Sequence, residues 1–176
     1  GACCASAWAI NNGIAGDPET VAVAGWSNGR AVLWTKAGPG WTIQVLGTLP
    51  GDDVGVAVDV NDVGDAVGLS GNSHTFVSRP VLWNAATATM LELSGLGGGD
   101  TIALRINNAG DVVGLSTDVS GNRHSIATAL NAPIEAPAVT IRCAEPPMSA
   151  RIAGTSSWRA EGGRHRATRA FRSRRR

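Results

Sequence analysis

Hydrophobic and polar residues alternate along several short stretches of this chain, with the period of two that is typical of β-strands. The stretch "TIALRIN" (101–107) alternates in this way, and "DVVGLS" (111–116) follows it after a turn that contains Gly110. Glycine adopts positive φ without a Cβ clash, so this turn suits a hairpin. The stretches "VAVDVN" (56–61) and "DAVGLS" (65–70) repeat the arrangement, so the pattern predicts two similar β-hairpins.

Two further apolar segments precede each of these predicted hairpins. They are "RAVLWT" (30–35) and "RPVLWN" (79–84), then "TIQVL" (42–46) and "TMLEL" (89–93). Glycine-rich links, "GTLPGD" (47–52) and "GLGGGD" (95–100), open the units that come after them. Each unit is therefore expected to contain about four short strands.

The order of these segments shows that the chain is an internal repeat. Ile10, Val60 and Ile106 occupy equivalent positions, which gives repeat steps of 50 and 46 residues. Units near 7–56, 57–102 and 103–142 would together form a β-repeat domain spanning residues 1–142. Four strands in a unit of this length are typical of a β-propeller blade. The predicted fold is all-β, with propeller-like tandem repeats in an incomplete ring of about three blades.

The composition agrees with short strands and many turns. Of 176 residues, 23 are Gly, 43% are hydrophobic and 16% are charged. No apolar run reaches the eighteen or so residues that a membrane-spanning helix requires. The chain begins with Gly and shows no signal-peptide pattern, which indicates a processed product or a fragment and leaves export undecided.

Charge divides the chain into two unlike parts. Residues 1–141 carry a net charge of −7, whereas residues 142–176 carry +8. The segment 143–176 is a Pro-rich linker followed by an Arg-rich tail with little to bury, so disorder is expected there. Such a tail could bind nucleic acid or anionic lipid, although base stacking is poorly supported because Phe171 is its one aromatic. A shifted reading frame at the end of a truncated gene explains the tail equally well.

The acidic stretch "VDVNDVGDAVG" (58–68) resembles a calcium loop in part. Counted from Asp59, Asn61 and Gly64 fit, but Val63 stands at position 5 and Ser70 at the position of the bidentate Glu. The next repeat also has Arg105 in place of Asp59, which a cation loop would not tolerate. We therefore interpret "NDVGD" and its equivalent "NNAGD" as the same turn in successive units, in which Asn and Asp bond nearby backbone.

Cysteine and tryptophan positions leave several alternatives open. Either Cys3 or Cys4 could form a disulfide with Cys143 in an oxidising compartment, although one thiol would remain. Trp34 and Trp83 are equivalent, so blade-to-blade packing is favoured over sugar stacking. The other tryptophans have no equivalents and could lie anywhere, including on a ligand rim: Trp8, Trp26, Trp41 and Trp158.

The repeated motifs resemble a known family. The stretch "LGTLPGDDVGVAVDVNDVGDAVGLS" (46–70) is similar to the consensus of the HAF-type bacterial extracellular repeats, and "HTF" (74–76), "HSI" (124–126) and "RAV" (30–32) match its naming triplet loosely. The resemblance covers about residues 7–130. It implies a secreted or surface-exposed bacterial β-repeat protein, and the resemblance implies no particular catalytic activity.

Candidate catalytic groups are few. His74 and His124 are expected to occupy equivalent positions in the "GNSH" and "GNRH" loops of successive units, which favours a packing or capping role for both over a role as general bases or metal ligands. Asp52, Asp53 and Asp100 could surround a cation but equally suit solvated turns. No Gly-x-Ser-x-Gly elbow or phosphate-binding loop is present, so we assign no catalytic, cofactor or metal site.

The sequence thus predicts an extracellular or surface β-repeat module with a structural or binding role. Its expected partners are a glycan, a protein, or further copies of itself through open blade edges. The rival hypothesis is a propeller-type hydrolase or lyase acting on polysaccharide, for which the two histidines and three aspartates are the candidate groups.

Overall fold

The computed structural model describes residues 4–14, 17–129 and 139–141. These residues form an all-β structure whose one helical segment is the single 3₁₀ turn η1 (Pro18–Thr20). Contacts group Gly1–Arg142 into one compact domain. The predicted linker and tail, 143–176, lie outside the described residues. None of the described segments is a helix that could cross a lipid bilayer.

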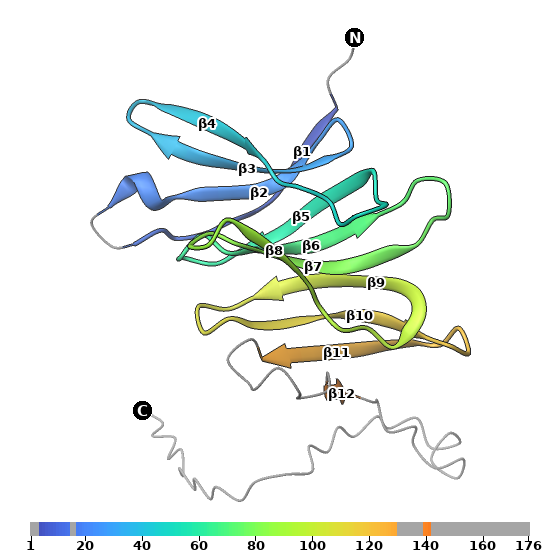
Figure 1. The fold of residues 1–176 in the computed structure, drawn as a ribbon. Helices are drawn as coiled ribbons and strands as arrows, with labels where there is room; N and C mark the ends of the chain where they lie inside the picture. The colour runs from blue at the N-terminus through green and yellow to red at the C-terminus, as the bar shows by residue number, and fades with distance from the viewer. Residues whose placement is uncertain (1–3, 15–16, 130–138, 142–176) are drawn as a thin grey trace, which may run out of the picture. The chain divides into compact units, whose positions relative to one another are not determined.

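The strands come in three antiparallel groups of four, which follow one another along the chain (Figure 1). Unit 1 contains β1 (Ala5–Ile10), β2 (Ala22–Ser27), β3 (Arg30–Ala37) and β4 (Gly40–Val45). Unit 2 contains β5 (Val54–Val60), β6 (Ala66–Gly71), β7 (Ser78–Asn84) and β8 (Thr89–Glu92). Unit 3 contains β9 (Gly97–Ile106), β10 (Asp111–Asp118), β11 (Arg123–Ala129) and β12 (Val139–Ile141). The strands predicted from alternation are confirmed.

Units 2 and 3 belong to one eight-stranded sheet, because a single parallel pair, Ser78 with Asp100, joins β7 to β9. The predicted glycine-rich link 95–100 is wrong in its second half. Gly97 pairs with Asp118, so β9 begins inside the link. Glycine makes this possible: a Cβ on Gly98 would lie 2.2 Å from the Asp118 carbonyl oxygen. The described strands form two sheets without closing into a ring.

The second strand of each unit contains a glycine at the same repeated position, and the geometry of the hairpin requires it. In each hairpin the first strand carries an irregularity of register, for instance between Ala57 and Asp59. This brings a carbonyl of the first strand over the glycine of the second. A Cβ would lie 1.9 to 2.2 Å from that oxygen at each of the three positions, Gly25, Gly68 and Gly114. No side chain fits there.

The core lies between the units. One apolar cluster joins residues of unit 1, such as Leu33 and Leu46, to Val60 and Trp83 of unit 2. A second cluster joins Val67 and Leu82 of unit 2 to unit 3. Since each unit buries a face against its neighbour, the units are stabilised by stacking.

Candidate functional site

An asparagine at the end of the first strand of each unit connects the units. Asn11 Nδ2 donates to the carbonyl oxygen of Asn61 at 2.9 Å, and Asn61 Nδ2 donates to the carbonyl oxygen of Asn107 at 3.2 Å. The separations in sequence, 50 and 46 residues, are the repeat steps themselves. We call these three residues the asparagine ladder.

The same asparagines also hold their own turns, as the sequence predicts. Asn61 Oδ1 accepts from the Asp65 amide at 2.9 Å, and Asn107 Oδ1 accepts from the Asp111 amide at 2.8 Å. Gly64 and Gly110 have φ of 91° and 86°, the conformation that glycine tolerates. The interpretation as repeated turns is thus confirmed in its geometry. The contact between units adds a second role that the turn pattern does not reveal.

Asp62 is the residue that follows the ladder in unit 2, and it contacts both neighbouring units. Its Oδ1 accepts from the Asn12 amide at 2.8 Å, and its Oδ2 accepts from Asn108 Nδ2 at 2.7 Å. Its own amide donates to Asn108 Oδ1 at 2.9 Å. The hydrogen bond from the Asn108 side chain, followed by that from the Asn12 amide, lowers the pKa of Asp62. The carboxylate therefore joins all three units.

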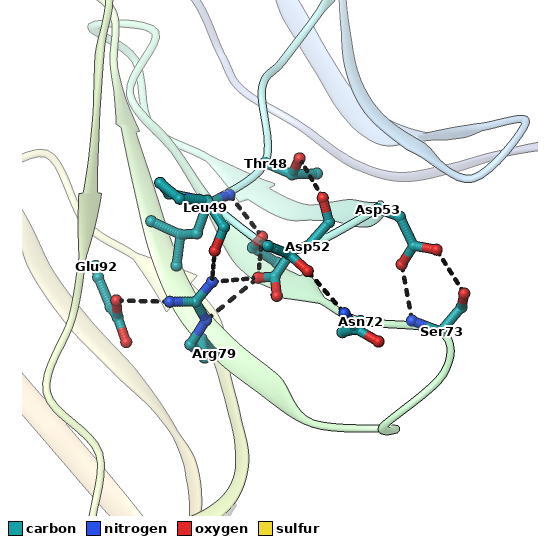
Figure 2. Close-up of polar contacts among 11 residues, drawn as sticks. Thr48, Leu49, Asp52, Asp53, Asn72, Ser73, Arg79 and Glu92 are labelled. Carbon is teal, nitrogen blue, oxygen red and sulfur yellow. Dashed lines mark hydrogen bonds and ion pairs between the residues drawn. The ribbon is translucent and has the colours of Figure 1, made fainter.

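Asp52, one of the predicted candidates, forms an ion pair with Arg79 (Figure 2). The Arg79 Nη2 atom lies 2.9 Å from Asp52 Oδ2, and its Nη1 donates to Glu92 Oε2 at 3.2 Å. The Asp52 side chain is only 7% exposed, and Ser70 Oγ donates to the same Oδ2 at 2.6 Å. These contacts fix the 47–52 link to the second sheet, so Oδ2 of the carboxylate is engaged within the protein.

Buried serines hold the link of each later unit. Ser70 Oγ accepts from the Leu49 amide at 2.9 Å, and Ser116 Oγ accepts from the Leu96 amide at 2.8 Å. Both serines are fully buried. Within the described residues no buried side-chain nitrogen or oxygen lacks a partner, so none points to a missing ligand.

Asp53, Ser73 and His74 lie together on an exposed loop. The Ser73 amide and hydroxyl both donate to Asp53, and Ser73 Oγ lies 3.4 Å from His74 Nδ1. The hydrogen bonds from Ser73 lower the pKa of Asp53. The His74 side chain is 86% exposed. A catalytic triad would place the carboxylate behind the imidazole, whereas here Asp53 bonds the serine directly.

The predicted equivalence of His74 and His124 is wrong. His124 lies in β11 opposite Ser116, the position that Arg79 holds opposite Ser70 in unit 2. Its Nε2 atom lies 2.8 Å from Asp118 Oδ2. Hydrogen bonding to His124 holds the pKa of Asp118 well below its usual range. The loop between β6 and β7 is longer than that between β10 and β11, which displaces the similar "GNSH" and "GNRH" motifs relative to the strands.

The remaining candidate, Asp100, accepts from Ser78 Oγ at 2.7 Å and lies 3.9 Å from Arg123 Nη2. Of the five predicted groups, the structure brings together only Asp53 and His74, on the exposed loop around Ser73, whereas Asp52, Asp100 and His124 each lie in a contact of their own. Among the described residues no three potential metal-ligating side chains come together.

Several hollows lie beside the repeated units. One of about 430 Å³ lies at the junction of units 1 and 2 and is lined by apolar and polar side chains, including Leu33, Gln44, Asn84 and Met90. Another, of about 540 Å³, lies at the junction of units 2 and 3 beside Asn61, Leu82 and Asn108. A third, of about 350 Å³, lies on the surface of unit 1 beside Trp34 and Trp41.

The tryptophans differ in burial. Trp83 is 6% exposed, donates from Nε1 to the Gly47 carbonyl oxygen and packs between units 1 and 2, as its repeat position predicts. Its equivalent Trp34 is only half-buried, while Trp8 and Trp41 are exposed. Trp158 lies outside the described residues.

Two of the three cysteines in the predicted disulfide, Cys3 and Cys143, lie outside the described residues. Cys4 is exposed, and its thiol is free.

Sequence reasoning missed the bonds between units made by the asparagine ladder and Asp62, although the matching Asn and Asp at the repeat step were a usable signal. A search of protein-family models, of curated proteins and of solved structures found no significant match to this chain.

Proposed function

We propose that this chain is a propeller-like β-repeat module with a structural or binding role outside the cell or at its surface. The observation that carries the proposal is the asparagine ladder, in which the same contact recurs at the repeat step. Repeated units that bury their faces on one another form an extended scaffold, which is the usual use of repeat proteins. The similarity to HAF-type repeats supports the extracellular location.

The geometry around the acidic candidates favours this role over polysaccharide hydrolysis. Asp52 is engaged by Arg79 and Ser70, and Asp100 by Ser78. A glycosidase needs two carboxyl groups facing each other across the scissile bond. The hollow at the junction of units 1 and 2 offers a concave surface with a few polar groups, as small-molecule and glycan sites do.

A glycan array followed by a product assay tests the proposal. We expect retained polysaccharide without release of shorter products, and binding weakened by Gln44→Ala or Asn84→Ala in the hollow between units 1 and 2. Release of products that is lost in His74→Ala would overturn the proposal in favour of a hydrolase or lyase.

A further inference from the structure

The outer face of unit 1 carries an apolar row that crosses all four strands. Ile10 pairs with Val23, Val23 with Trp34, and Trp34 with Ile43, so these four side chains share one face. Ile10 and Ile43 are 64% and 63% exposed. Exposed apolar patches of this kind mark interaction surfaces.

The equivalent row in unit 2 shows what such a face fits. There Val60 pairs with Ala66, Ala66 with Trp83, and Trp83 with Met90. Val60, Ala66 and Trp83 are buried, and Met90 packs against the same cluster, which contains Ala24 and Leu33 of unit 1. The row of unit 2 is therefore covered by the opposite face of the preceding unit.

Within this chain, the face that corresponds to the cover lies on unit 3. Val67 and Leu82 pair across unit 2 and pack toward unit 3. Their counterparts in unit 3 are Val113 and Ala127, which also pair across the strands. Val113 is 45% exposed. A second copy thus offers the kind of surface that the row on unit 1 accepts.

The ladder has matching ends on the same two units. The Asn11 carbonyl oxygen corresponds to the oxygens of Asn61 and Asn107 that accept from a preceding unit. The side-chain nitrogen Nδ2 of Asn107 corresponds to the donors of Asn11 and Asn61, and in unit 3 it donates to Asp111 Oδ2. Docking unit 3 of one copy onto unit 1 of another would extend the ladder by one step.

From these observations we infer that this protein associates head to tail, with Val113 and Ala127 of one copy covering Ile10, Trp34 and Ile43 of the next. The two faces differ, so the contact is heterologous and either closes into a ring or continues along a filament. The inference rests on the repeat stacking of the proposed function, but it requires no glycan.

Sedimentation equilibrium of the full chain over a wide range of concentrations tests this inference. Wild-type chain should form reversible assemblies, and Ile43→Lys should weaken them at least about tenfold, because it places a charge in an apolar contact. Trp41→Ala, beside the row, is the milder second variant. Phe76→Lys, which changes an 86% exposed residue of the β6–β7 loop, is the matched control and should associate like wild type. Circular dichroism checks that each variant is folded.

The direction of docking is tested with Val113→Lys. In a head-to-tail contact, Val113→Lys and Ile43→Lys each weaken association. Mixing the two variants restores association in part, because the unchanged unit 3 face of the Ile43→Lys chain can dock on the unchanged unit 1 face of the Val113→Lys chain. A wild-type monomer at all concentrations would overturn the inference. So would loss of association in Ile43→Lys without loss in Val113→Lys, which indicates two unit 1 faces meeting. A monomer that still retains polysaccharide would leave the proposed function standing.

Discussion

The side-chain amide of Asn61 donates to the backbone carbonyl of Asn107, 46 residues further along the chain, while its Oδ1 atom caps its own turn. One side chain therefore holds both a hairpin and the contact with the following unit. Asn61 is only 4% exposed, so water does not readily replace either bond. This relationship explains why asparagine recurs at the step of the repeat.

Replacing Asn61 by alanine should destabilise the protein. Removing one partner of a buried hydrogen bond costs about 1–3 kcal/mol, because the other group is left unsatisfied. Asn61→Asp keeps the acceptor for the Asp65 amide but replaces the donor to Asn107 by an oxygen that repels the Asn107 carbonyl, so it acts on the contact between units and should cost more than the turn alone. Urea denaturation measures both variants. Unchanged stability in Asn61→Asp would show that the ladder contributes nothing.

Replacing Gly68 by alanine should destabilise the protein by about 3 kcal/mol, at the upper end of the usual cost of overpacking. The new Cβ would lie 1.9 Å from the Val56 carbonyl oxygen, so β5 or β6 must shift. Gly47→Ala is the matched control, because its new methyl group would have no neighbouring atom within 4 Å and the φ of Gly47 is not positive. Thermal melting of both variants provides the comparison. Equal melting temperatures would contradict the close approach.

Much of the fold could be predicted from the sequence because its determinants are local. Alternation identified the strands, and the Asn-x-x-Gly-Asp turns identified the hairpins. Strand β12 lies where the repeated motifs have faded, and the join between Ser78 and Asp100 has no local signal, so neither was predicted. The stacking of units was inferred from the repeat, and Trp83 confirms it.

The candidate site was harder to predict because similar motifs lie at different positions relative to the strands. His74 and His124 each lie two residues after an Asn in a short polar stretch. The β6–β7 loop, which contains His74, is longer than the β10–β11 loop, so only His124 lies in a strand. Likewise, sequence alone could not show that Asp52 pairs with Arg79, 27 residues away. Contacts between distant residues need the register of the sheets, which periodicity does not supply.

Stability should fall as the solution becomes more acidic than about pH 4, and Asp62 should contribute to that fall. Its pKa is lower in the folded protein than its ordinary value of 3.8, because Asn108 and Asn12 donate to the carboxylate. The contribution is therefore complete above the unfolded pKa and disappears as pH falls through the folded pKa. Urea midpoints measured from pH 7 to pH 2 should decline less steeply in Asp62→Asn than in wild type. Parallel profiles would contradict a role for the Asp62 carboxylate.

Replacing Arg79 by methionine should cost about 2 kcal/mol. Breaking a fully buried ion pair costs about 3–5 kcal/mol, and the loss is smaller here because the Arg79 side chain is 29% exposed and water can reach it. Methionine keeps the apolar stem of the arginine, so the change reports on charge and hydrogen bonding with Asp52, Glu92 and the Pro50 carbonyl. Arg123→Met is the control, since this 64% exposed arginine lies 3.9 Å from Asp100 and such pairs contribute under about 1 kcal/mol. Urea denaturation should separate the two variants, and equal losses would mean that the contacts of Arg79 contribute no more to stability than an exposed ion pair.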